Sequence, residues 1–164
     1  MNTVPAEGTE LMGTRASVSA VATSLKSLLA DSYSLMAQTH LAHWNVEGPA
    51  FFQLHTAFQT QYEEMFTAID EIAERLRALD VLAPGGLTTF AKLSKVPEFG
   101  AAPAPAKDFV AHLVDGHEQA AASAKAVRDA AEQAKDLETQ DLAISRIQLH
   151  QKTLWMLKSF LKNL

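Results

Sequence analysis

Four long segments of this chain carry apolar side chains at the spacing of an α-helix, and this pattern limits the fold more than any other feature. In the first segment, from Val18 onward, apolar residues recur three, four and seven positions apart. Gly48 and Pro49 end that segment, and a second runs from about Ala50 to Leu79. No alternating strand pattern of useful length is present, so the sequence predicts an all-α protein.

A long connection separates the second helical segment from the third. It begins at Pro84-Gly85-Gly86 and contains a short amphipathic piece, residues 89–93, that we expect to form a small helix. The third and fourth segments cover about residues 106–134 and 139–161. Four long helices with one extended connection predict a four-helix bundle with a crossover, comprising residues 16–164. Residues 1–15 have little apolar content and are predicted to be a flexible N-terminal tail.

The composition excludes several classes of protein. The chain has 164 residues, enough for one domain with a real core, and no cysteine, which excludes disulfide scaffolds, thiolate zinc sites and cysteine nucleophiles. No apolar run approaches the roughly 20 residues of a membrane span, and no secretory signal is visible. The net charge of -5 argues against a surface that attracts nucleic acid as a whole. We therefore expect a cytoplasmic protein with no membrane association.

Two histidines and two carboxylates lie on the first two helices in positions suited to metal binding. The turn between these helices centres on Pro49, so His43 and His55 are equidistant from it and should face each other. Asp70 and Glu74 lie one helical turn apart further along the second helix. At about 1.5 Å per residue, His55 and Asp70 are roughly 22 Å apart, whereas metal–ligand bonds are about 2.0–2.6 Å. One chain therefore cannot close this site.

A twofold axis offers a way to complete the site. Two antiparallel copies of the second helix would join the histidine half of one chain to the carboxylate half of the other, and would do so twice. Mixed imidazole and carboxylate ligands suit iron, manganese or zinc. The alternative is that the histidines only pack and the carboxylates lie on a solvated face, where Glu71 and Arg75 are expected to pair.

The other histidines show less sign of metal binding. His40 precedes His43 by one turn and is near enough to join the site, although a structural role is the simpler interpretation. No glutamate is followed by a histidine three residues later, which disfavours a di-iron site inside one bundle. We interpret three further histidines as structural: His112, His117 and His150.

The sequence around both half-sites resembles the Dps family of mini-ferritins. The matching runs are HLAHWNVEGPAFFQLH at residues 40–55, DEIAERLRAL at 70–79 and HQKTLWML at 150–157, and the resemblance covers residues 17–162. It implies a ferritin-like fold and a hollow homo-dodecamer, built from twofold dimers, that oxidises Fe(II), typically with hydrogen peroxide. The ferric product is stored as a mineral, which protects DNA from oxidative damage. By this motif, the ferroxidase ligands are His43 and His55 of one subunit with Asp70 and Glu74 of its mate.

One position departs from the family pattern. The family usually has Asp or Glu four residues after the second histidine, where this chain has Gln59. Glutamine keeps an oxygen donor but removes a negative charge, and hard cations favour charged oxygen ligands. We expect a weaker second iron position, an attenuated ferroxidase, and a site that also accepts other divalent metals such as zinc. Glu63, one turn further along, is a possible substitute.

The resemblance also bears on iron entry and on DNA. Three acidic residues fall where the family lines its iron-entry pores, Glu132, Asp136 and Asp141, although an ordinary acidic connection explains them as well. The family's DNA binding often depends on a lysine-rich tail, because phosphate contacts require Lys or Arg. This tail carries Glu7, Glu10 and only Arg15, so we expect weak or absent DNA binding.

Two other functions remain open from the sequence. One is a nucleoid-associated, DNA-compacting protein with weak or no ferroxidase activity, which is the only case in which we expect nucleoid localisation. The other is a purely structural shell or a zinc-binding bundle.

Overall fold

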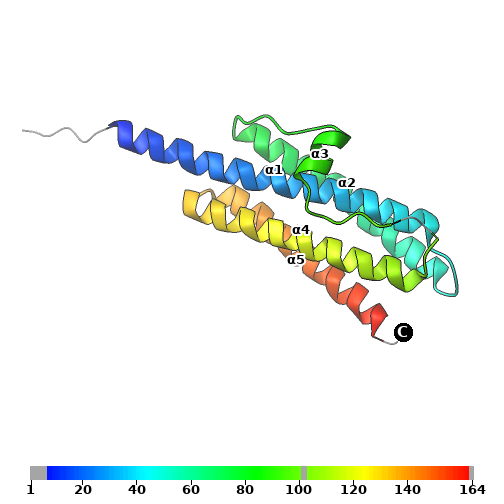
Figure 1. Ribbon diagram of the computed structural model, residues 1–164. Helices are drawn as coiled ribbons and strands as arrows, with labels where there is room; N and C mark the ends of the chain where they lie inside the picture. Colours follow the sequence, from blue (N-terminus) through cyan, green and yellow to red (C-terminus); the bar gives the residue numbers. More distant parts are fainter. Residues whose placement is uncertain (1–6, 101–102, 163–164) are drawn as a thin grey trace, which may run out of the picture.

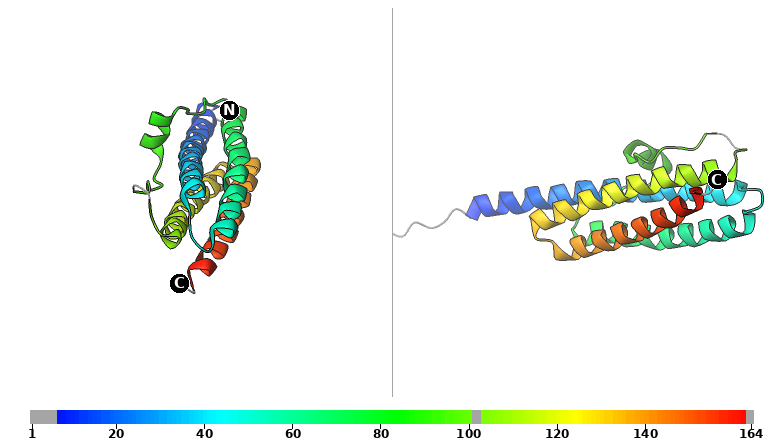
Figure 2. Two further views of the ribbon diagram at one scale, coloured as in Figure 1. Left: turned by 90° about the vertical axis from the view of Figure 1, so that its right-hand side faces the viewer. Right: turned by 90° about the horizontal axis from the view of Figure 1, so that it is seen from below.

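The computed structural model describes residues 7–100 and 103–162, with side chains from residue 15 onward. These residues form five helices and no strand: α1 (Glu7–Asn45), α2 (Phe51–Ala78), α3 (Leu87–Leu93), α4 (Ala106–Ala134) and α5 (Leu137–Leu161). The four long helices pack as a bundle, and α3 lies outside it beside α1 (Figures 1 and 2). The predicted all-α bundle, with a short extra helix in the connection, is confirmed.

The connection between α2 and α4 sets the topology of the bundle. α1 and α2 form an antiparallel hairpin, after which the chain passes through α3 and returns along the bundle to the end where α4 begins (Figure 1). As a result α4 runs parallel to α2, and α5 returns antiparallel to α4 (Figure 2). None of the helices in the described part of the chain is long and apolar enough to cross a membrane.

The first helix starts earlier than the sequence pattern indicates. α1 begins at Glu7, within the segment predicted as a tail, while residues 1–6 lie outside the described residues. The flexibility of residues 1–15, and the domain boundary that follows them, stay predictions.

The apolar stripes predicted from the sequence form the core. Along α2 the fully buried members are Leu54, Phe58, Met65, Ile72 and Leu76. They pack in two clusters, one around Phe58, Phe109 and Leu113 and the other around Leu25, Leu28 and Ile72. Burying one such side chain stabilises the fold by about 1.5–3 kcal/mol, so the core stabilises the α1–α2 hairpin that carries the candidate site.

Small residues let α1 and α4 approach closely. A Cβ added at Gly116 would lie 2.7 Å from Leu35 Cδ1, too close for ordinary contact. Ala120 and Ala124 continue the same buried side of α4. This agrees with the alanine-rich third segment of the sequence.

A buried carboxylate fastens the crossover connection to the bundle. Asp31 of α1 is 1% exposed and accepts hydrogen bonds from Ser94 Oγ (2.9 Å) and the Lys95 backbone N–H (2.6 Å) in the connection. It also accepts from Gln119 Nε2 (3.0 Å) and Ser123 Oγ (2.5 Å) of α4. One side chain therefore joins three segments. Its four hydrogen bonds satisfy the requirement that a buried polar group be hydrogen-bonded.

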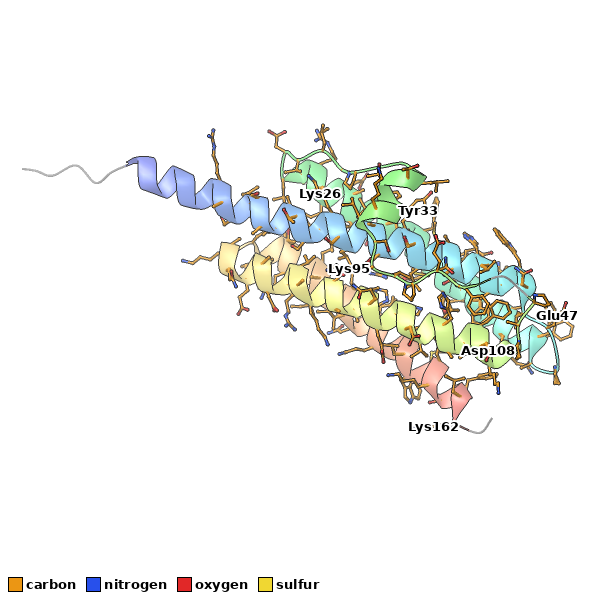
Figure 3. All side chains as sticks on the ribbon, viewed as in Figure 1. Lys26, Tyr33, Glu47, Lys95, Asp108 and Lys162 are labelled. Carbon is orange, nitrogen blue, oxygen red and sulfur yellow. The ribbon has the colours of Figure 1, made fainter. Side chains whose placement is uncertain are left out.

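Aromatic packing places α3 against α1. Tyr33 of α1 stacks on Phe90 of α3 with ring centroids 4.5 Å apart, and Figure 3 labels Tyr33 and Lys95 where the connection passes α1. Phe90 is the buried residue of this short helix.

Candidate metal site at the α1–α2 turn

The turn between α1 and α2 brings the two predicted histidines face to face. Gly48 adopts φ of +99°, a conformation that favours glycine, and its carbonyl accepts the Phe51 N–H at 3.0 Å. Val46, immediately before the turn, is buried and anchors the chain. The hairpin is thus closed by local geometry, and His43 and His55 lie at the same level on neighbouring helices.

His43 and His55 hold each other by a reciprocal pair of hydrogen bonds. His43 Nδ1–H donates to the His55 carbonyl at 2.8 Å, and His55 Nδ1–H donates to the His43 carbonyl at 2.9 Å. The two rings stack with centroids 3.7 Å apart. A carbonyl oxygen can only accept, so each Nδ1 carries the ring proton. In its neutral form each ring then has its lone pair on Nε2, the arrangement that orients a histidine for metal binding.

Aromatic rings surround this pair. Tyr62 meets His43 edge-on at 5.2 Å and lies 4.2 Å from His40, whose ring stacks on Trp44 at 5.3 Å. Burial, together with the nearby His43, lowers the pKa of His40 below its usual value. Tyr62 was not among the residues singled out from the sequence, although it lies on α2 three residues beyond Gln59 and faces the same site.

The predicted ligand Gln59 is engaged through its amide nitrogen. Gln59 Nε2 donates to Glu63 Oε1 at 2.8 Å, and both side chains are exposed. The Gln59 oxygen has no hydrogen bond within the described chain, so an oxygen donor remains available at this position.

Asp70 and Glu74 lie on the same helix but apart from the histidines. Both are exposed, and neither has a hydrogen bond or ion pair within residues 15–100 and 103–162. In this described part of the chain, no three His, Asp or Glu side chains come close enough together to hold a metal ion. The predicted histidine ligands and the predicted carboxylate ligands therefore lie apart within one chain.

The face that carries both half-sites also exposes large aromatic side chains. Trp44 is 70% exposed, Phe52 80% and Phe66 72%. Beside them is a pocket of about 490 Å³, lined by Met36, His40, Tyr62, Glu63 and Phe66. Large aromatic side chains exposed together on one face are typical of surfaces that associate with protein.

The prediction of a surface ion pair between Glu71 and Arg75 is wrong. Arg75 instead reaches the start of α5, where Arg75 Nη2 bonds Asp136 Oδ1 at 2.7 Å and Nε bonds Thr139 Oγ1 at 2.7 Å. A partner on another helix is available because the α4–α5 turn lies beside this end of α2.

The three acidic residues suggested for an iron-entry pore have different surroundings. Glu132 and Asp141 are exposed. Asp136 caps α5 by accepting the Thr139 N–H at 3.0 Å, and it also pairs with Arg75. Burial alone would raise the pKa of Asp136, but the bonds from Thr139 and the Arg75 charge outweigh it and lower the pKa. Asp136 is thus committed to contacts within its own subunit.

A second histidine pair lies in the bundle core. His117 of α4 and His150 of α5 are almost completely buried, their Nδ1 atoms are 2.9 Å apart, and neither Nε2 has a protein partner. Burial lowers the pKa of His117 to about 3, with a further contribution from Arg146, and burial also lowers the pKa of His150 well below its usual value. Both rings are therefore neutral near pH 7. Thirty-three positions separate the two residues, so no local pattern reveals the pair.

Comparisons with known proteins agree with this architecture. The family model of the ferritin-like domain matches residues 22–164. "DNA protection during starvation protein 2" of Bacillus anthracis is 32% identical over 137 residues, covering 84% of this chain and 93% of the relative.

Solved structures extend the agreement. Dps from Thermosynechococcus elongatus superposes with a TM-score of 0.87 at 30% identity, covering 92% of this chain and 95% of that one. Dps from Vibrio cholerae, described as a member of a superfamily of ferritin-like diiron-carboxylate proteins, gives 0.85 at 27% identity and covers 90% and 92%.

The fold and the matches together define a ferritin-like protein. Within that class, the chain belongs to the Dps family.

Proposed function

We propose that this protein oxidises Fe(II) at sites shared between two subunits and stores the ferric product inside a hollow homo-dodecamer. Its relatives support iron storage and DNA protection as the general role of the family. The observation that carries the specific proposal is the reciprocal His43–His55 hydrogen bonding, which leaves two Nε2 lone pairs available on a face that one chain leaves incomplete.

The two half-sites have complementary chemistry. His43 and His55 supply neutral nitrogen ligands, while Asp70 and Glu74 of the partner subunit supply negatively charged oxygens that neutralise the bound cation. Fe(II) is the substrate, and hydrogen peroxide is the proposed oxidant: two Fe(II), one peroxide and two protons give two Fe(III) and two waters. Holding two iron ions together lets both electrons pass to one peroxide, so no hydroxyl radical is released.

The exposed aromatic face supports the pairing of subunits. An isologous twofold interface would bury the Phe66 side chains of both subunits and bring Trp44 and Phe52 into contact with the partner subunit. Covering such side chains is a typical source of interface stability.

Gln59 is proposed as a weaker ligand of the second iron position. Its free amide oxygen can still coordinate, but it lacks the charge of a carboxylate, while its amide nitrogen is held by Glu63. The proposed activity is therefore slower than that of a site with a carboxylate there, and zinc or another divalent ion can compete for the same ligands.

We propose that iron enters near Glu132 and Asp141, with Asp136 holding the α4–α5 turn in place through Arg75 and Thr139. We also propose weak or absent DNA binding, because the net charge is -5 and the terminal segments have few basic residues. A cytoplasmic location is part of the same proposal.

Two single variants test the shared site. His43→Ala and Asp70→Ala should each abolish fast Fe(II) oxidation, measured by ferric absorbance after peroxide addition, while the helical circular dichroism stays unchanged. After the two variants are unfolded and refolded together, mixed dimers should recover activity, because one of their two sites has all its ligands. No recovery in proven mixed dimers would mean that both residues act within one chain.

A gel-shift assay separates the proposal from the DNA-compacting alternative. The wild-type protein should oxidise Fe(II) without shifting duplex DNA at physiological salt. A clear shift with negligible oxidation would favour the nucleoid-associated role.

A further inference from the structure

The shared-site arrangement, on which this inference rests, fixes where the twofold axis crosses α2. The histidine of one copy must lie level with the carboxylate pair of the other. The point midway between His55 and the centre of the Asp70–Glu74 pair falls at residues 63 and 64 on α2. Glu64 is turned toward α5, where it pairs with Arg146. Glu63 lies on the same stripe as His55, Gln59 and Asp70, so it faces its own copy across the axis.

The surroundings of Glu63 offer little neutralising charge within the chain. One carboxylate oxygen accepts the Gln59 amide at 2.8 Å, and Glu63 has no ion pair among the described residues. Two such carboxylates brought close together at an interface repel each other. A divalent cation between them would replace that repulsion with attraction.

A histidine, His40, lines the same pocket as Glu63. His40 and Glu63 both line the pocket of about 490 Å³ beside the axis, with Tyr62 and Phe66. The ring of His40 is held between Tyr62 and Trp44, and neither of its nitrogens has a hydrogen-bond partner within the described chain. The ring is thus positioned by stacking while its nitrogens remain available for a ligand.

We propose that the twofold axis carries a separate divalent-cation site, formed by Glu63 and His40 of one subunit with Glu63 and His40 of the partner subunit. Two imidazole nitrogens and two carboxylate oxygens form a donor set that suits Zn²⁺, Fe²⁺ or Mn²⁺. The site is distinct from the two His43–His55 sites, because each dimer has only one of it. Its role is to join the two subunits at the point where their carboxylates would otherwise repel.

The number of bound ions per chain distinguishes this site from the His43–His55 sites. A site on a twofold axis contributes one-half ion per chain, whereas a site away from the symmetry axes contributes whole ions. Metal-free assembled protein should be dialysed against Zn²⁺ at increasing concentration, and the bound metal measured per chain. We expect Glu63→Gln to lower the plateau by one-half ion per chain, and His40→Asn to weaken or remove the same half ion.

Three further proteins make the result specific. Glu98→Gln, which changes an exposed glutamate on the connection, should bind as much zinc as the wild type. His43→Ala should lose the shared sites but keep the half ion, and adding Glu63→Gln to it should remove that too. An unchanged plateau in His43→Ala would count against the proposed function, whereas an unchanged plateau in Glu63→Gln would overturn the axial site alone.

Crystals of the zinc-loaded protein give an independent result. An anomalous difference peak on the twofold axis between the two Glu63 side chains supports the proposal. A dimer in which the carboxylates approach without a metal, sharing a proton instead, overturns it. Light scattering should confirm that each variant assembles. If Glu63→Gln does not assemble, His40→Asn provides the same test of the axial site.

Discussion

At the scale of single residues, the candidate site is set by which atoms carry protons. His43 and His55 each donate from Nδ1 to the other's carbonyl, so in both rings Nε2 is the nitrogen left for a metal ion, without help from any other side chain. Gln59 differs because its amide nitrogen is held by Glu63 and only its oxygen remains available. This difference makes position 59 the point where the proposed ferroxidase can be strengthened.

We predict that Gln59→Glu increases Fe(II) binding and the rate of peroxide-driven oxidation. A carboxylate attracts a hard divalent cation more strongly than an amide oxygen does. The new charge lies one turn from Glu63, and such like-charged pairs destabilise a helix by only about 0.2–0.5 kcal/mol. Isothermal titration and stopped-flow absorbance would measure the two effects, with Gln53→Glu on the same helix as a control. Equal rates and stoichiometry would show that position 59 does not contact the metals.

The buried His117–His150 pair makes stability depend on pH. Because burial lowers both pKa values in the folded chain, the unfolded chain binds more protons below pH 6.5. The free energy of unfolding should therefore be highest above pH 6.5 and fall as the pH is lowered toward about 3, the pKa of His117, by roughly 1 kcal/mol per pH unit for that residue. The lowered pKa of His150 adds to the fall in the same direction.

Urea denaturation at several pH values between 4 and 7 would measure this slope. The double variant His117→Leu/His150→Leu, which removes both partners together, should show a smaller slope over the same range. Asp136 adds dependence of the same sign at lower pH, since its pKa is also lowered. An identical slope in the double variant would mean that other groups cause the acid sensitivity.

At the scale of elements, the bundle depends on a few polar contacts that join segments distant in sequence. Asp31 connects α1, the crossover connection and α4. Two ion pairs join α2 to α5: Arg75 of α2 pairs with Asp136 at the start of α5, and Glu64 of α2 pairs with Arg146 of α5. Apolar packing fixes the helices, but these contacts fix the path of the chain between them.

We predict that Asp31→Ala destabilises the protein by about 3 kcal/mol, because four hydrogen bonds are lost and buried donors are left without an acceptor. The urea midpoint at fixed protein concentration would measure the change. Asp129→Ala, which removes an exposed ion pair with Arg128, should alter stability by less than about 1 kcal/mol. Similar effects of the two substitutions would contradict the role assigned to Asp31.

At the scale of the whole molecule, the predicted metal ligands do not come together within the described chain. The proposed half-sites and the exposed aromatic side chains share one face, and the proposed function places a second copy on it in a defined orientation. Closing twelve such chains into a shell would then place every shared site at a dimer interface.

We predict that light scattering shows a closed dodecamer, and that Phe66→Asp disrupts it by placing a charge in the twofold interface. The variant should keep its helical content but lose fast Fe(II) oxidation, since the two halves no longer meet. Leu82→Asp, on the connection and 77% exposed, is the matched control and should assemble normally. A wild-type protein that remains a stable monomer or isolated dimer at physiological salt would contradict the model.

The sequence by itself determined the helices, their order and the pairing of His43 with His55. Helical periodicity and a turn centred on Pro49 are local properties, and position along two adjoining helices follows directly from them. The same local spacing showed that Asp70 and Glu74 lie too far along α2 to join His55 in one chain. The partner they require stays a prediction.

Only the tertiary structure decided which polar groups meet. It directed Arg75 to Asp136 rather than to Glu71, paired His117 with His150, and gathered four donors around Asp31. These contacts join residues 33 to 92 positions apart, so they depend on how the helices pack and on the path of the crossover connection. Local pattern cannot supply that information, because a side chain's hydrogen-bond partner is set by packing rather than by its neighbours in sequence.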